Sequence, residues 1–180
     1  MDVVRHAVLN RFGEQWTLRY RREIGHPPER VWAELTDPGQ LGTWFPTGVV
    51  GEWSVGAALE FPFPDSAFPT MHGTVLQVRK PRVLEYTWGP DTLLFTLEPG
   101  GPGTHLDFVV TLEELGKAAR DGAGWHEALD LMETCLDGDE RWPLGERWPD
   151  LAPVYADAFG PEASTIGPPE GWTAPRDPEA

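Results

Sequence analysis

The sequence predicts an α+β protein in which a curved antiparallel sheet packs against one long amphipathic helix. Three observations lead to this prediction. Residues 49–112 contain short segments with apolar side chains at alternate positions, separated by turns rich in glycine and proline, which is typical of an antiparallel meander. Residues 118–136 repeat apolar side chains at helical spacing. Residues 26–46 carry the signals of two short helices.

The first strand of the domain is expected at residues 16–24. Alternate side chains there share one face, which is apolar except for an arginine: Trp16, Leu18, Tyr20, Arg22 and Ile24. An inward arginine is costly to bury without a partner. Arg22 therefore either forms a structural ion pair or binds a carboxylate or carbonyl group of a ligand, and the residues alone leave both alternatives open.

Two short helices are expected after this strand. Pro28 suits the first turn of a helix, and the pair Asp37-Pro38 ends that helix and can cap the next one. Trp44 and Phe45 then follow as a large aromatic block. We expect these two helices to fill the gap that remains between the sheet and the long helix.

The meander should contribute further strands with one apolar face. They are expected at residues 57–63, 71–79, 82–88, 91–97 and 104–112. Their inward side chains include large rings and leucines: Phe61, Phe63, Tyr86, Trp88, Leu93, Phe95 and Phe108. The facing of residues 71–79 is ambiguous because both alternate sets contain apolar members, and we assign His72 and Leu76 to the inward face.

Residues 118–136 should form the longest helix, with Gly138 as its C-cap. Its inward stripe is continuous: Trp125, Ala128, Leu129, Met132 and Leu136. Ala128 is the smallest residue of this stripe. We expect a cavity beneath Ala128, so that a tryptophan placed there would enter open space.

The organisation of the chain follows from these elements. Residues 1–15 are expected to form an N-terminal extension that could add a strand, and residues 16–137 the main domain. Residues 138–163 should form a C-terminal extension with a short helix that ends at Phe159. Residues 164–180 are rich in proline and poor in apolar side chains, which predicts a disordered tail.

Composition and charge restrict the class of function. The chain has 14 basic and 29 acidic residues and a net charge of −15, which disfavours nucleic acids and anionic membrane surfaces as partners. Its single cysteine excludes an intrachain disulfide. We expect a cytoplasmic protein without membrane insertion, because an N-terminal apolar run and a segment of transmembrane length are both missing. The nine tryptophans indicate a wide core or an aromatic-lined cavity.

Catalytic and metal-binding patterns are weak in this sequence. The five histidines lack the spacing of metal ligands, so neither a metal nor a cofactor is expected. His105 and Asp107 share one strand face and could form an acid–base pair, but alternation places that face in solvent. No catalytic residue is therefore assigned.

Five pieces of the chain, in their order and spacing, resemble the SRPBCC superfamily, which has the START or Bet v 1-like helix-grip fold: RREIGHPPERVWAELTD, LGTWFP, HGTVLQVRKPRVLEYTW, LEPGGPGTHL and GWHEALDLMETCL. Within it they are most similar to the group of activator of heat-shock-protein-90 ATPase homologues, of the bacterial stand-alone type. The resemblance implies a seven-stranded antiparallel sheet that grips a long C-terminal helix. It also implies a hydrophobic cavity that holds a lipid or another apolar ligand.

The expected cavity lining combines the inward faces with the aromatic block after the short helices. It comprises Leu18, Tyr20, Arg22, Trp44, Phe45, Phe61, Phe63, His72, Leu76, Tyr86, Trp88, Leu93, Phe95, Phe108, Trp125, Ala128, Leu129 and Met132.

Three classes of function stay open. The first, which we favour because aromatic side chains are abundant, is a protein that binds a small apolar or lipid-like ligand without catalysis. The second is an enzyme of the cyclase, dehydratase or hydrolase type that uses the same cavity. The third is an interaction module, either a homodimer or a chaperone partner. A chaperone partner is less favoured because the eukaryotic co-chaperones of this group have an additional N-terminal domain that this sequence lacks.

Overall fold

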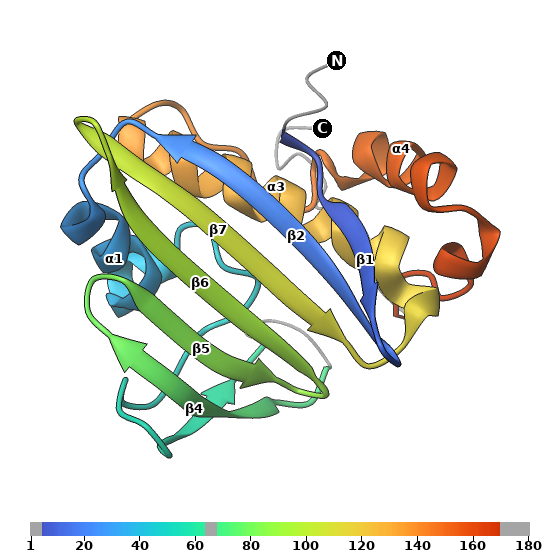
Figure 1. The fold of residues 1–180 in the computed structure, drawn as a ribbon, viewed down its shortest axis with the longest axis horizontal. Helices are drawn as coiled ribbons and strands as arrows, with labels where there is room; N and C mark the ends of the chain where they lie inside the picture. The colour runs from blue at the N-terminus through green and yellow to red at the C-terminus, as the bar shows by residue number, and fades with distance from the viewer. Residues whose placement is uncertain (1–4, 64–67, 170–180) are drawn as a thin grey trace.

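The fold is known from a computed structural model that describes residues 5–63 and 68–169 of the chain. Seven strands form one antiparallel sheet in the order β1-β2-β7-β6-β5-β4-β3. The strands are β1 (Val8–Phe12), β2 (Gln15–Ile24), β3 (Ala58–Phe61), β4 (Met71–Arg79), β5 (Val83–Trp88), β6 (Asp91–Gly100) and β7 (Gly103–Leu112). The helix α3 (Ala118–Asp137) runs across one face of this sheet (Figure 1). The predicted α+β helix-grip fold is confirmed.

The centre of the sheet follows the alternation that the sequence predicts. In β2, Leu18, Tyr20 and Arg22 are buried, and β2 pairs along its length with β7, where Tyr20 lies opposite Phe108. The other face of this pair of strands is polar and more exposed. The apolar side chains of alternate residues are thus collected on the side that α3 covers.

His105 and Asp107 do not form an acid–base pair on the polar face. The Nδ1 atom of His105 lies 2.6 Å from Oε1 of Glu23, whereas Nε of Arg19 donates to Oδ1 of Asp107 at 2.9 Å. Each residue therefore has its own cross-strand partner on β2, which agrees with a solvated strand face.

The assignment of His72 and Leu76 to a cavity lining is wrong, because both side chains are exposed on β4. The register between β4 and β5 passes from Val75 opposite Tyr86 to Gln77 opposite Glu85, so that Leu76 is an extra residue in a bulge. A bulge interrupts the alternation of side chains, which explains why this strand gave no clear facing in the sequence.

The two predicted short helices are α1 (Pro28–Thr36) and α2 (Pro38–Leu41). Asp37 caps α2, since its Oδ1 atom accepts hydrogen bonds from the backbone of Gly39 at 2.9 Å and Gln40 at 3.2 Å. Trp44 follows and donates from Nε1 to the carbonyl oxygen of Glu34 at 3.0 Å. The aromatic block is therefore buried and fixed against α1.

The long helix α3 is preceded by the short 3₁₀ helix η2 (Leu115–Lys117) and ends at Gly138, whose φ of 72° is the left-handed C-cap conformation. The extension then forms α4 (Trp148–Phe159), which packs on α3, and the 3₁₀ helix η3 (Pro161–Ser164). Figure 1 shows α4 beside α3, beyond the edge strand β1.

The prediction of disorder from residue 164 onward is wrong for residues 164–169. The backbone of Ile166 donates to the carbonyl oxygen of Gly116 at 3.0 Å, and Arg120 donates to the carbonyl oxygen of Gly167 at 3.2 Å. Residues 164–169 therefore pack against η2 and α3. Residues 170–180, the rest of the expected tail, lie outside the described residues.

Candidate functional site

Arg22 is the buried centre of a partly exposed ion-pair network between β2 and α3. Its side chain is 1% exposed, and its Nη1 atom lies 2.6 Å from Oδ1 of Asp130 and 2.7 Å from Oε2 of Glu133. Arg5 contacts the same two carboxylates, and its carbonyl oxygen accepts a hydrogen bond from Nη2 of Arg22 at 3.1 Å. Arg22 is thus a structural ion-pair residue, and its assignment to a ligand site is wrong.

The network continues through two side chains that the sequence analysis did not connect. His126 lies with its Nε2 atom 3.3 Å from Oδ2 of Asp130 and its Nδ1 atom 2.8 Å from the hydroxyl of Tyr155. The backbone of Ala7 donates to the same hydroxyl at 2.9 Å. Burial raises the pKa of Tyr155 to about 12. This cluster joins α3, α4 and the N-terminal segment, and it lies outside the pocket described below.

The pKa of Asp130 lies well below its ordinary value. Burial by itself would raise this pKa, but the hydrogen bond to His126 and the charge of Arg22 outweigh burial, and Arg5 adds to their effect. The folded protein therefore favours the ionised carboxylate more than the unfolded chain does. That stability is fully present well above pH 4, which is about the pKa of an aspartate in the unfolded chain, and it is lost progressively as the pH falls toward the lower pKa that Asp130 has in the folded protein.

An acid-dependent loss of stability is the expected result. The free energy of unfolding should fall by about 2 kcal/mol from this one group between about pH 5 and pH 2. Urea unfolding at a series of pH values measures the fall, and Asp130→Asn should show a shallower dependence than the wild type. An identical dependence in both proteins would contradict the role of Asp130.

Most of the residues expected to line a cavity instead form a packed core. Those that expose no surface are Leu18, Tyr20, Phe61, Leu93, Phe95, Phe108, Ala128, Leu129 and Met132. Phe95 and Phe108 stack with centroids 4.3 Å apart, and the hydroxyl of Tyr20 donates to the carbonyl oxygen of Gly122 at 2.6 Å. A side chain without exposed surface borders no void of the size of a water molecule. The cavity expected beneath Ala128 is therefore a wrong prediction, since rings and leucines fill that space.

Trp44, Phe45 and Tyr86 belong to the same core, with exposed fractions of 1%, 6% and 1%. Phe45 packs edge-to-face on Trp88 with centroids 5.2 Å apart. The expected aromatic block thus closes the core at this end of the sheet.

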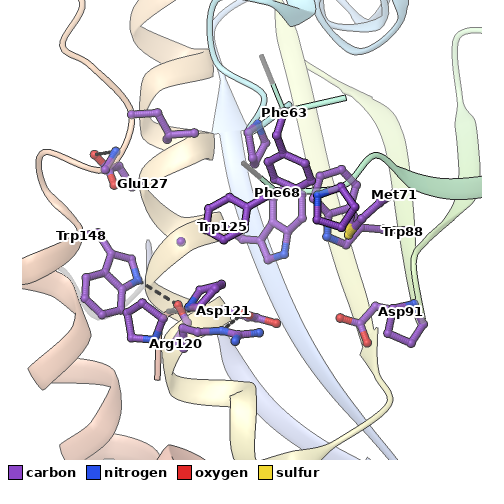
Figure 2. A pocket seen from close by; sticks show the side chains of 18 residues that line it. Phe63, Phe68, Met71, Trp88, Asp91, Arg120, Asp121, Trp125, Glu127 and Trp148 are labelled. Atoms are coloured by element: carbon purple, nitrogen blue, oxygen red, sulfur yellow. Dashed lines mark hydrogen bonds and ion pairs between the residues drawn. The ribbon is translucent and has the colours of Figure 1, made fainter. Parts of the chain in front are cut away.

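A pocket of about 570 Å³ opens at one end of this core, between α3, the turn from β5 to β6, and the C-terminal extension. Of the residues expected to line a cavity, it contains Phe63, Trp88 and Trp125. The rings of Trp88 and Trp125 meet edge-to-face with centroids 5.6 Å apart. Figure 2 shows these rings gathered with Phe68 and Met71 on one side of the pocket.

The opposite side of the pocket carries two ion pairs. Asp91 accepts from Nζ of Lys117 at 2.7 Å, and Nε of Arg120 donates to Oδ1 of Asp121 at 2.8 Å (Figure 2 shows the second pair). Burial raises the pKa of Asp121, and Arg120 only partly offsets this effect. The pocket therefore has an aromatic side and a charged side, as ligand sites commonly have.

Glu127 connects the pocket to the extension. Its side chain lines the pocket, and its Oε1 atom accepts three hydrogen bonds: from Nε1 of Trp142 at 3.1 Å, from the backbone of Gly145 at 3.0 Å and from the backbone of Arg147 at 2.9 Å. The carboxylate thereby holds the start of α4 against α3. The sequence places Glu127 next to the apolar stripe but contains no signal of this role.

The outer wall of the pocket comes from the extension. Leu144, Gly145 and Trp148 contribute to it, together with Pro168 and Pro169. The indole of Trp148 is held by a hydrogen bond from Nε1 to the carbonyl oxygen of Arg120 at 3.0 Å. This wall was not predicted from the sequence, in which its one signal is the Arg-Trp-Pro sequence that occurs at both 141 and 147.

Within residues 5–63 and 68–169, there is no group of three or more side chains that could hold a metal ion. The helices of this part of the chain are too short or too polar to cross a membrane.

The fold and the core thus define a helix-grip protein with a pocket beside its long helix. A comparison with protein families matches residues 25–137, more than half of the chain, to the model described as Activator of Hsp90 ATPase homolog 1-like protein. The chain belongs to this family. None of the curated proteins with which it was compared matches it.

Solved structures share the fold over most of the chain. A conserved protein of unknown function, EF2215 from Enterococcus faecalis, has a TM-score of 0.73 at 21% identity and covers 85% of this chain and 90% of its own. CalU16 from Micromonospora echinospora has a TM-score of 0.68 at 22% identity and covers 85% and 96%. MLL2253 from Mesorhizobium loti is 28% identical, with a TM-score of 0.60 and coverage of 69% and 98%. The first two likenesses, below 25% identity, concern the fold alone.

Proposed function

We propose that this protein binds a small, largely apolar molecule in the pocket between α3, the β5–β6 turn and the C-terminal extension. The observation that carries the proposal is the aromatic lining, in which Trp88, Trp125 and Trp148 surround a volume of about 570 Å³. Pockets of roughly 300–1,000 Å³ with apolar walls and a few polar groups are typical of small-molecule sites. The family fold, in which apolar ligands are commonly bound, supports the same proposal.

An enzyme is the second candidate, and Asp121 is the residue that favours it, because a partly buried carboxyl group with a raised pKa can act as a general acid or base. Two observations weigh against it. Arg120 already pairs with this carboxylate at 2.8 Å. The described residues that line the pocket include no histidine, cysteine, serine or threonine, so a hydroxyl or thiol nucleophile with a histidine base is missing from them.

Gly124 offers a direct test of the binding site. It lies on α3 in the pocket lining, and a Cβ atom added to it would meet nothing within 4 Å. Gly124→Phe should therefore fill the pocket and lower the affinity for the neutral apolar dye N-phenyl-1-naphthylamine by about tenfold or more. Gly124→Ala, which leaves most of the volume free, should bind the dye nearly as the wild type does.

Dye fluorescence, which rises in apolar surroundings, measures both affinities. Equal binding by the wild type and Gly124→Phe would place the dye elsewhere and contradict the proposed site. A wild type that binds no dye and no other apolar probe would contradict the function itself.

A further inference from the structure

We propose that the ligand of this pocket is an organic cation: an aromatic or aliphatic body that carries an amine or a quaternary ammonium group. This inference rests on the proposed function, because it assigns the charge of the molecule that the pocket binds. The charges around the pocket and the aromatic residues of its walls both favour a cation.

In each of the two ion pairs at the charged side, the positive and the negative group neutralise each other. Asp91 uses Oδ1 for Lys117 at 2.7 Å and for the backbone of Glu113 at 2.9 Å. Arg120 is committed to Asp121 at 2.8 Å and to the carbonyl oxygen of Gly167. These groups add no net charge, and neither cation is left over for an anionic ligand.

Glu127 is the third carboxylate of the lining, and it has no cationic partner among the described residues. The residue is 1% exposed, and its three hydrogen-bond partners in the described part of the chain are neutral N–H groups of an indole and of the backbone, all on Oε1. The guanidinium of Arg147 lies instead over the ring of Trp142, 3.4 Å from its centroid. The pocket therefore contains one more negative than positive group, and a buried carboxylate without a counter-charge favours a cation beside it.

The walls of the pocket suit the same ligand. The negative faces of aromatic rings attract cations, tryptophan most strongly, and aromatic cages are a recurrent means of holding quaternary ammonium groups. Trp88, Trp125 and Trp148 all line the pocket, and Trp148 is held in place through its Nε1 atom. Each of these tryptophan rings can thus contact the apolar body of the ligand or stabilise its positive charge.

The negative charge of the rest of the protein also favours a cationic ligand. The whole chain carries a net charge of −15, and acidic residues outnumber basic ones in the extension that forms the outer wall. Burial is the main cause of the raised pKa of Asp121, and the negative charge of the nearby Asp91 contributes to it, so these two carboxylates already repel each other at this side. An anionic ligand would add to this repulsion, whereas a cation would be attracted from a distance.

Three probes of one shape separate charge from apolar burial: phenylbutylamine, phenylbutanol and phenylbutanoate. Isothermal titration calorimetry of the full chain at neutral pH measures their affinities. We expect the amine to bind about tenfold more tightly than the alcohol, and the carboxylate to bind most weakly. The preference for the amine should decrease as salt is added, because salt screens the charge, whereas the affinity for the alcohol should not.

Glu127→Gln tests the residue itself. Glutamine keeps an oxygen for the three N–H donors and removes only the charge, so the variant should lose most of the preference for the amine and keep its affinity for the alcohol. The matched control is Glu146→Gln, which removes an exposed acid of the extension that does not line the pocket and should change neither affinity. A thermal melt checks that both variants are folded, and the salt series on the wild type decides the question if Glu127→Gln is not.

The outcomes are distinguishable. If the alcohol binds and the amine is not preferred, or if the carboxylate is preferred, the inference of a cationic ligand is wrong. The proposed apolar binding site would still be supported. A preference for the amine that survives in Glu127→Gln would overturn the role of this residue. Binding of none of the three probes would overturn the inference and the proposed function together.

Discussion

Replacing Arg22 by methionine is expected to lower the free energy of unfolding by about 3–5 kcal/mol, which is the loss typical of breaking a buried ion pair on one side. Arg22 is 1% exposed in its side chain and joins β2 to Asp130 and Glu133 of α3. Methionine fills a similar volume but leaves these two carboxylates without their buried partner. Arg5, whose side chain is 37% exposed, would then be the remaining arginine that contacts both of them, and His126 would still contact Asp130.

Arg19 provides the matched control on the same strand. It pairs with Asp107 on the opposite face of the sheet, where the two side chains are 40% and 29% exposed. An exposed pair contributes little, so Arg19→Met should cost less than about 1 kcal/mol. Urea unfolding of both variants measures the two losses, and a small loss for Arg22→Met, equal to that of Arg19→Met, would show that the buried network does not stabilise the fold.

Ala128→Trp is expected to destabilise the protein by about 1–3 kcal/mol or more, because a large ring enters a core that is already filled. Ala128 has an exposed fraction of 0%, and its neighbours on the stripe, Leu129 and Met132, are equally buried. The expected sign is therefore opposite to the one that a cavity beneath the helix predicts.

Gly124→Phe, one turn earlier in α3, is the control for added bulk. Its side chain extends into the pocket, and replacing a glycine in a helix removes a cost of up to about 1 kcal/mol, so the stability of this variant should be kept or should rise. Thermal unfolding compares the two variants with the wild type. If Ala128→Trp is tolerated as well as Gly124→Phe, the core beneath α3 is not packed as described.

Local patterns in the sequence determined the fold. The alternation in residues 16–24 identified the buried face of β2, including Arg22, because successive side chains of a strand point to opposite faces. The spacing in residues 118–136 identified α3 within one residue of its observed C-terminus, because an amphipathic helix must bury its apolar stripe. Asp37 was recognisable as a cap from its own side chain and the proline after it.

The tertiary structure alone decided where the space between the sheet and α3 is filled by side chains and where a pocket is left open. Whether inward rings enclose a void depends on how their volumes fit together across the layers, as Phe95 and Phe108 do by stacking, and no single strand contains that information. The bulge at Leu76 changed the facing of β4 for a similar reason, since it is defined by pairing with another strand. The outer wall of the pocket comes from residues of the extension, which take their position from hydrogen bonds to Glu127, Arg120 and Gly116. These contacts join distant parts of the chain, so the candidate site exists only once the sheet, the long helix and the extension have packed together.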